Sequence, residues 1–342
     1  MYKFLIRPLL FLFDPEKVHN YLAKSVIFIS KIPFVSSILR NQFTYKSPSL
    51  EKEIMGIHFP NLVGLAAGFD KNAAFFKEFS VFGFGFIEIG TLTPKPQAGN
   101  PKPRSFRLTR DRALINRMGF NNLGVDEAVK KLKNRPPGVI IGGNIGKNTT
   151  TPDNKVVEDY EYSFTRLYDH VDYFVVNVSC PNIGDISKLQ DQETIEAILF
   201  RLSDLRNLRP VYRPILLKIS PDLNFRQIDE TIDIIQKIGI DGIVAVNTTI
   251  TRNGLKTPDE KVKAIGKGGL SGTPLNSRSN EIIRYVKNKT TIPVIGSGGI
   301  LTVNDAVEKI KAGADLLQIY TGFIYEGPGF AKKINKVLKN LL

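Results

Sequence analysis

Short runs of β-branched and other apolar residues alternate with amphipathic segments from residue 60 to the C-terminus, and this alternation restricts the possible folds more than any other feature. Eight of these runs have the length and composition of buried parallel strands. The predicted strands are Leu62–Ala67, Phe84–Gly90, Val139–Ile145, Asp172–Val178, Pro214–Ile219, Gly242–Asn247, Ile292–Gly296 and Leu316–Tyr320. Helical patterns separate most of them, including Val156–His170, Thr194–Leu208, Phe225–Ile238 and Val303–Ala312. This order predicts an α/β fold, a (β/α)8 TIM barrel, with a doubly wound open sheet as the alternative.

Small or polar side chains stand at the C-terminal end of each predicted strand. In chain order they include Gly68, Asp70, Lys71, Thr91, Asn144, Asn177, Ser179, Cys180, Lys218, Asn247, Thr248, Ser297, Gly298, Gly299, Tyr320 and Thr321. Barrel enzymes build their active sites at this face, from the loops that follow the strands. Two inserts, Leu92–Pro137 and Thr249–Pro274, are longer than ordinary loops, and we expect them to form lids or walls of the site.

The charge balance favours an anionic partner. The chain carries 47 Lys and Arg against 33 Asp and Glu, a formal net charge of +14. This excess suits phosphate, a carboxylate substrate, a phospholipid surface or nucleic acid. The positive charges form no long block, which argues against a nucleic-acid-binding arm. The single cysteine excludes an internal disulfide, and the three histidines lie far apart in the sequence, so we expect no metal site.

The first 46 residues differ from the rest of the chain. Their apolar opening contains Lys3, Arg7 and Pro8, so it reads neither as a secretory signal peptide nor as a membrane-spanning helix. The segment holds seven Lys and Arg, which suits a membrane interface, although a helical cap packed on the main domain is the alternative. Before Pro33, one predicted helical face contains Val18, Tyr21, Leu22, Ser25, Val26 and Ile29.

Glycine-rich loops and two lysines point to a phosphorylated, ring-bearing ligand. The runs Gly268–Gly272, Gly296–Ile300 and Tyr320–Gly322 lie around the last two predicted strands, where barrels often bind phosphate through backbone N–H groups. Glycines in loops also simply form turns. Lys71 and Lys218 each follow or end a strand, where a cation can stabilise an anionic reduced cofactor, although a solvated surface lysine is the alternative.

Asparagines suggest the chemistry of the substrate. Asn116, Asn177, Asn182 and Asn247 fall in predicted site loops, and each carboxamide offers a donor and an acceptor. Several of them together can match the amide edges of a small planar heterocycle such as a pyrimidine. Lys71 can then neutralise a carboxylate of the substrate. The alternative is that these asparagines only favour turns.

A series of motifs resembles dihydroorotate dehydrogenase in the order of that family: GLAAGFDK, EIGTLTPKPQAGNPKPRSFRL, NRMGFNN, NIGKN, NVSCPN, NTT, GGLSG, GSGGI and QIYTGFIYEGP. The N-terminal RPLLFLFDPEKVHNY and NRMGFNN resemble class 2, the membrane-associated, quinone-dependent branch. The resemblance implies a barrel with tightly bound FMN that oxidises (S)-dihydroorotate to orotate in de novo pyrimidine (UMP) biosynthesis. It also implies a helical membrane and quinone-access segment at residues 1–46 and a catalytic barrel at residues 47–342. We expect a monomer at the cytoplasmic face of the cell membrane, peripherally bound to phospholipid, without a nucleic-acid partner.

The same resemblance assigns roles to individual residues. The implied FMN contacts are Ala67, Gly68, Phe69, Asp70, Lys71, Thr91, Asn144, Asn177, Lys218, Val246, Gly272, Gly299, Tyr320 and Thr321. The implied substrate contacts are Lys71, Asn116, Arg117, Met118, Gly119, Phe120, Asn177, Asn182, Asn247 and Thr248. His19, Arg107 and Tyr320 match positions near the inner end of a quinone tunnel. Val246 stands where class 2 relatives usually carry Thr, so only a backbone contact to FMN is implied there.

Cys180 departs from the class 2 pattern, because class 2 enzymes usually carry Ser as the base in this loop. In NVSCPN the resemblance makes Cys180 the general base that removes the C5 proton of dihydroorotate, while the hydride from C6 goes to flavin N5. Lys218 is implied to favour the anionic reduced flavin. A cysteine after a buried strand can also be a packing residue. Two other functions stay open: a soluble class 1-like enzyme that uses fumarate or NAD, and a non-enzymatic basic protein that binds membrane or nucleic acid.

Overall fold

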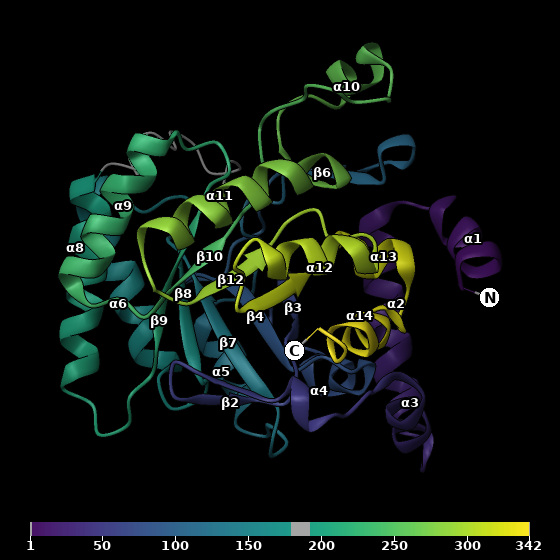
Figure 1. Ribbon diagram of the computed structural model, residues 1–342, viewed down its shortest axis with the longest axis horizontal. Coiled ribbons are helices and arrows are strands. Elements are labelled where there is room, and N and C mark those ends of the chain that lie inside the picture. Colours follow the sequence, from purple (N-terminus) through teal and green to yellow (C-terminus); the bar gives the residue numbers. More distant parts are fainter. Residues whose placement is uncertain (1, 179–191, 342) are drawn as a thin grey trace.

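Eight parallel strands form a closed barrel in the computed structural model, which describes residues 2–178 and 192–341 (Figure 1). Their order around the barrel is β10-β12-β13-β3-β4-β7-β8-β9, and β9 pairs with β10 to close it. The strands are β3 (Val63–Asp70), β4 (Phe86–Leu92), β7 (Ile140–Ile145), β8 (Tyr173–Asn177), β9 (Ile215–Ile219), β10 (Gly242–Ala245), β12 (Val294–Ser297) and β13 (Leu316–Ile319). The predicted barrel is therefore confirmed, and the open-sheet alternative is wrong.

Helices connect the strands, and all of those described in the structure except α10, which packs in the small core of the inserts, lie around the barrel. They are α4 (Phe76–Phe79), α5 (Val125–Leu132), α6 (Val156–Leu167), α8 (Gln192–Asn207), α9 (Phe225–Ile238), α10 (Asp259–Ile265), α11 (Asn276–Lys289), α12 (Val303–Lys311), α13 (Thr321–Glu326) and α14 (Phe330–Leu338). Capping residues at both ends of α9 explain why its observed bounds agree with the predicted ones. Asn224 and Gln227 form a reciprocal capping box at its start, and Gly239 adopts the left-handed conformation (φ 78°) at its end.

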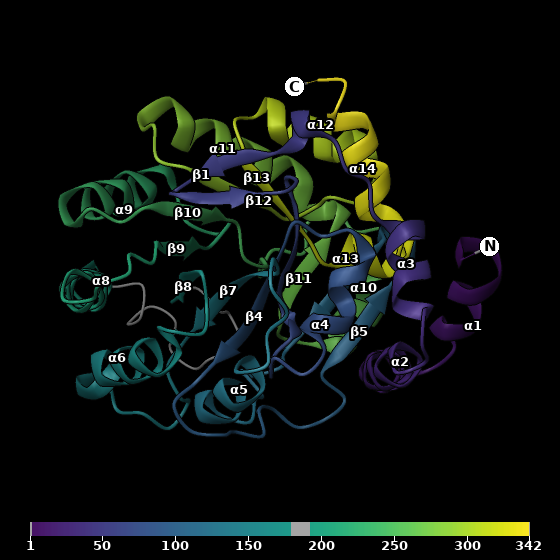
Figure 2. The ribbon, with the colours of Figure 1, turned by 90° about the horizontal axis from the view of Figure 1, so that it is seen from below.

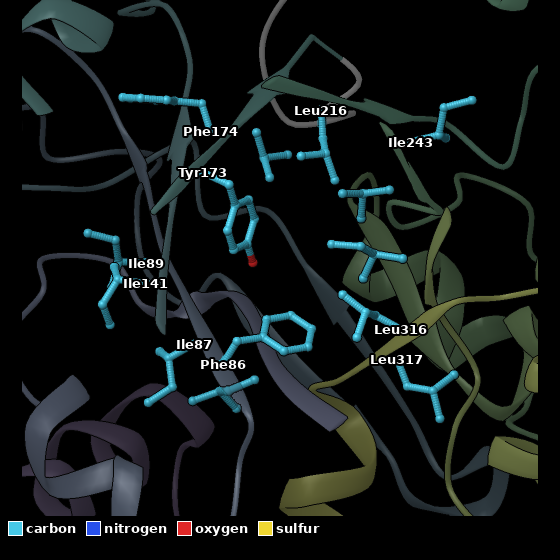
Figure 3. Packing of buried hydrophobic residues seen from close by; sticks show 14 of the residues in the cluster. Phe86, Ile87, Ile89, Ile141, Tyr173, Phe174, Leu216, Ile243, Leu316 and Leu317 are labelled. Atoms are coloured by element: carbon cyan, nitrogen blue, oxygen red, sulfur yellow. The ribbon is translucent and has the colours of Figure 1, made fainter. Parts of the chain in front are cut away.

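Large side chains fill the barrel interior near the N-terminal ends of the strands (Figure 3). The rings of Phe86 and Tyr173 point toward one another across this space, with centroids 6.3 Å apart. Glycines make room for them, because a Cβ on Gly64 would lie 2.3 Å from the Phe86 ring and one on Gly142 would lie 2.2 Å from Tyr173. Phe59, on the hairpin of β1 (Lys52–Ile54) and β2 (Ile57–Phe59), packs on Phe86. The end of the barrel at the N-termini of the strands is thus filled by side chains. The functional end is therefore the opposite one, at the C-termini of the strands.

The two long inserts meet in a small antiparallel sheet beside the site. Strands β5 (Ser105–Leu108) and β6 (Ala113–Asn116) come from the first insert, and β11 (Gly269–Gly272) comes from the second. Their order is β11-β6-β5, with Gly269 opposite Asn116, and apolar side chains such as Ile115 form a separate small core. The sequence predicted walls of the site here but not a sheet that joins the inserts.

The N-terminal segment forms four short helical elements that lie beside the barrel, on the opposite side from α8 in both views (Figure 2). They are the π-helix η1 (Tyr2–Ile6), α1 (Arg7–Phe11), α2 (Pro15–Ser30) and α3 (Val35–Phe43). Asp14 caps α2 by accepting from the Lys17 N–H, and α2 ends at Ser30, before the predicted stop at Pro33. None of the helices described in the structure could cross a membrane alone; α2 and α3 pass that test of length and composition only as a pair bent by 117°.

Candidate active site and the passage beside it

One cavity of about 630 Å³ extends from the C-terminal ends of the barrel strands to the space under the N-terminal helices. Its inner part carries polar side chains, which include Lys71, Thr91, Asn116, Asn177, Lys218, Asn247, Thr248, Ser271 and Thr321. Its outer part is lined by apolar side chains, which include Ile6, Leu10, Phe11, Val18, Leu22, Val26, Ile29, Leu39, Phe43, Phe79, Phe82 and Phe323. The cavity therefore joins a polar binding region to an apolar one.

Amide and hydroxyl groups in the inner part orient one another through hydrogen bonds. Thr91 Oγ1 donates to Asn144 Oδ1 (2.5 Å) and accepts from Asn177 Nδ2 (2.9 Å). Asn247 Nδ2 donates to Asn177 Oδ1 (3.3 Å). Asn144 is fully buried behind Thr91 and Asn177, so it acts from behind the cavity wall. These bonds fix the orientation of the carboxamide groups of Asn144 and Asn177.

Both lysines that the sequence singled out face the cavity. Lys71 Nζ donates to Asn121 Oδ1 at 2.8 Å, and Lys218 Nζ lies 3.8 Å from Glu88 Oε1. The side chain of Lys218 is only 7% exposed. A half-buried site with two ammonium groups suits an anionic ligand and an electron-rich ring.

The glycine loops leave backbone groups accessible at the ends of β12 and β11. Gly298, Gly299 and Gly272 line the cavity and have positive φ angles of 98°, 76° and 104°. A Cβ on Gly299 would lie 2.3 Å from the Cα of Asn276, whose side chain also donates to the Gly299 carbonyl at 3.0 Å. Only glycine fits this close approach, which keeps the loop in a shape suited to a phosphate.

Besides Asn144, two residues expected to contact ligands do not line the cavity, namely Asp70 and Arg117. The Asp70 carboxylate accepts from the N–H groups of Ala74 (2.7 Å) and Phe75 (2.9 Å), and burial raises its pKa. Arg117 donates to the Ile265 carbonyl and stacks over Phe106 at 4.6 Å, so it joins the two inserts. Both side chains position the loops around the site, and the expected contacts of Asp70 with FMN and of Arg117 with substrate stay predictions.

The remaining predicted contacts converge as expected in space. Ala67, Gly68, Phe69, Met118, Gly119, Phe120, Val246 and Tyr320 all line the same cavity. Cys180 and Asn182 lie outside the described residues, so their roles remain predictions from the motif. In the described part of the chain, no group of three or more His, Cys, Asp or Glu side chains could hold a metal ion.

The three residues predicted for a quinone site, His19, Arg107 and Tyr320, all line the same cavity. His19 packs edge-on against Phe69 with centroids 4.8 Å apart, and burial together with nearby Lys71 lowers the pKa of His19 to about 4. Arg107 places its guanidinium 4.5 Å from the Phe11 ring centroid. Burial raises the pKa of Tyr320 to about 12. At neutral pH these three residues therefore present a neutral imidazole, a neutral phenol and one cation.

Several site residues were missed by sequence reasoning. Glu88 and Gln318 are buried inside the barrel and hydrogen-bonded to each other, and Ser271 pairs with Thr321 at 2.9 Å at the cavity wall. The sequence did contain a signal for Glu88 and Gln318, because each interrupts an otherwise apolar predicted strand. A polar residue inside a buried strand must find hydrogen-bonding partners. Ser271 had no comparable signal.

A buried ion pair fastens α2 to the rim of the site. Glu16 accepts from Arg104 Nη2 at 2.8 Å and from Nε at 3.1 Å, and Lys102 lies 3.5 Å away. The Arg104 side chain is 7% exposed and that of Glu16 is 12% exposed. The hydrogen bonds from Arg104 lower the pKa of Glu16. This pair stabilises the folded protein at pH values above the ordinary pKa of a glutamate. The stabilisation is lost as the pH falls through the lowered pKa of Glu16.

We expect Glu16→Gln to loosen α2 while the barrel stays folded. Loss of the charge-assisted bonds should cost about 1–2 kcal/mol of local stability. Hydrogen exchange should therefore become faster in α2 and remain unchanged in α9. Glu230→Gln is the matched control, because Glu230 pairs with the 88% exposed Arg226 on the surface of α9. Unchanged exchange in α2 for Glu16→Gln would contradict the anchoring role.

The fold and the site define the class of this protein: a (β/α)8-barrel enzyme with adjoining polar and apolar binding regions. Residues 49–342 match the model of the family described as dihydroorotate dehydrogenase. The chain is 52% identical over 338 residues to the dihydroorotate dehydrogenase (quinone) of Christiangramia forsetii, covering 98% of each chain. It is 44% identical to that of Thermosynechococcus vestitus, covering 98% of this chain and 96% of the relative.

Solved structures agree with the sequence comparisons. A crystal structure of dihydroorotate dehydrogenase (DHODH) from Eimeria tenella in complex with ferulenol matches this chain with a TM-score of 0.83 and 33% identity. The match covers 96% of this chain and 91% of that one. The ligand-free structure from the same organism matches with a TM-score of 0.82. The chain belongs to the dihydroorotate dehydrogenase family, and the resemblance found in its motifs is confirmed.

Proposed function

We propose that this protein oxidises (S)-dihydroorotate to orotate in de novo pyrimidine biosynthesis and passes the electrons through bound FMN to a membrane quinone. The continuous cavity carries this proposal, because its polar part suits the heterocycle and its apolar part suits a lipophilic acceptor. The names of the relatives, dihydroorotate dehydrogenase (quinone), support the same acceptor. A soluble class 1-like enzyme has no need of an apolar passage, and a protein that binds through charge alone has no need of a buried polar site.

The residues at the strand ends fit FMN by their chemistry. Gly272 and Gly299 offer backbone approach at a phosphate-binding position, and Lys218 offers a charged donor in the buried interior. Thr91 and Asn177 line the same region, where their hydroxyl and carbonyl oxygens would face the bound group. The wider set of proposed FMN contacts comprises Ala67, Gly68, Phe69, Lys71, Val246, Tyr320 and Thr321, and Asn144 supports them from behind the cavity wall. Bound FMN supplies a hydride acceptor for the substrate and an electron donor for the quinone.

The protein's own groups bind, orient and deprotonate the substrate. Lys71 neutralises its carboxylate, and the carboxamides of Asn116 and Asn247 match its amide edges. Cys180, as a thiolate, removes the proton from C5. The preset hydrogen bonds around Asn177 mean that little reorganisation is needed when the substrate binds, so alignment contributes to the rate.

Residues 1–46 form the quinone-access segment of this proposal, and residues 47–342 form the catalytic barrel. Exposed apolar side chains on the N-terminal elements support contact with a phospholipid surface: Phe4, Leu5, Leu9, Leu12, Phe13, Tyr21, Phe28, Ile32, Phe34 and Ile38. We place this contact at the cytoplasmic face of the membrane, with the protein bound peripherally as a monomer.

The function is tested by comparing electron acceptors. We expect the purified protein to show flavin absorbance and, with dihydroorotate as donor, to reduce a quinone at least about tenfold faster than fumarate or NAD. Release of the cofactor by denaturation identifies it as FMN. A colourless protein would contradict the flavoenzyme proposal, and faster reduction of fumarate or NAD would favour the class 1-like alternative.

A further inference from the structure

A carboxylate lies buried in the barrel beneath the lysine of the site. Glu88, in the middle of β4, is 0% exposed. Asn144 Nδ2 donates to its Oε1 at 2.8 Å, and Gln318 Nε2 donates to its Oε2. The Lys218 ammonium is 3.8 Å from Oε1. Two amide groups therefore donate hydrogen bonds to the two oxygens of Glu88, and an ammonium group lies close to one of them.

We propose that Glu88 balances the charge of Lys218 and thereby sets the reduction potential of the bound FMN. Lys218 lines the cavity, whereas Glu88 does not, so the cation is the nearer of the two to the ligand. In a buried site the two charges act on each other and on the ligand with little screening by water. Lys218 favours the negatively charged reduced form of a ring beside it, and Glu88 opposes that effect. Glu88 acts through Lys218 and is a positioning residue, not a catalytic one.

The burial of Glu88 supports a role for its charge. Burial of a carboxylate away from water is costly, and at this position two hydrogen bonds and a nearby ammonium group offset that cost. Glu88 also fixes the orientation of Asn144, whose Nδ2 points to Glu88 while its Oδ1 accepts from Thr91. Asn144 Oδ1 also accepts from Asn177 at 3.3 Å. The carboxylate thus supports the polar wall of the cavity as well as the ammonium.

Redox titration of the bound flavin tests this inference, which rests on the FMN binding proposed above. For Glu88→Gln we expect a more positive midpoint potential, favouring the reduced form by about tenfold, or about 30 mV for a two-electron couple. Lys218→Met should shift the potential in the opposite direction. The double variant should lie between the two single variants, because it lacks both charges.

The control for net charge is Glu53→Gln, which removes an exposed carboxylate on β1 at the far end of the barrel and should leave the potential unchanged. The FMN dissociation constant is measured for every variant. If Glu88→Gln does not fold, the double variant compared with Lys218→Met isolates the same charge and should have the higher potential. An unchanged or lower potential on removal of Glu88 overturns the inference. Absence of FMN from the parent protein instead overturns the proposed function.

Discussion

Cys180→Ala should slow the reduction of bound flavin by dihydroorotate by about 10²–10⁴-fold, the contribution of a well-placed general base. Orotate binding should remain close to that of the parent protein, because Lys71, Asn116 and Asn247 are unchanged and line the cavity. Stopped-flow flavin absorbance measures the reduction rate without the quinone step. Titration of the flavin spectrum with orotate measures binding. A large loss of rate with intact binding would separate a chemical role from a packing role.

Cys180→Ser is the informative companion variant. A thiol has an ordinary pKa near 8.5, far below that of a serine hydroxyl, so the cysteine is partly ionised near neutral pH. The serine variant should keep measurable activity with its pH dependence moved upward. Rates are compared from pH 6 to 10. If Cys180→Ala reduces its flavin as fast as the parent at every pH, another residue is the base.

The barrel was predictable because each of its elements has a local signature. Buried parallel strands read as apolar runs, and helices such as α9 carry their own start and stop signals. The sheet of β5, β6 and β11 was not predictable, since its register depends on contact between two distant inserts. Local periodicity carries no information about such pairing.

The site was predictable in composition but not in detail. The rule that strand ends carry the chemistry identified Lys71, Lys218 and Asn177, and all three line the cavity. The motif did not reveal side-chain direction: Asp70 accepts hydrogen bonds from the loop that follows it, and Arg117 stacks on Phe106 of its own insert and donates to Ile265 of the other. Both outcomes depend on which backbone groups and rings lie nearby in three dimensions.

The apolar part of the cavity explains the unusual surface of the N-terminal segment. Helix α2 directs Leu22 and Val26 into the cavity, whereas Tyr21, which was predicted on the same face, does not line the cavity and is 70% exposed. A helix that only capped the barrel would bury its apolar face against the core. Here Ala23 packs in the core, but Leu22 and Val26 also line the cavity and the outer face meets solvent. This arrangement suits a helix placed between a membrane and a passage for a lipophilic molecule.

Filling that passage should therefore stop the quinone selectively. We expect Leu22→Trp to lower the rate of quinone reduction by roughly tenfold to a hundredfold, because an indole overfills space that the quinone needs, at a cost of about 1–3 kcal/mol. Reduction of flavin by dihydroorotate, and of a small soluble dye by the reduced enzyme, should change little. Steady-state assays with both acceptors and stopped-flow flavin reduction measure the three rates.

Tyr21→Trp is the matched control, since it adds the same side chain to the outer face of the same helix. It should leave all rates near those of the parent. Flavin content and thermal unfolding are compared first, so that a damaged barrel is recognised. Equal losses with quinone and dye in Leu22→Trp would identify the N-terminal helices as a structural cap, and unchanged quinone reduction would place the quinone's route elsewhere. A loss confined to the quinone would instead mean that the polar and apolar regions of the cavity serve successive steps, with α2 controlling only the second.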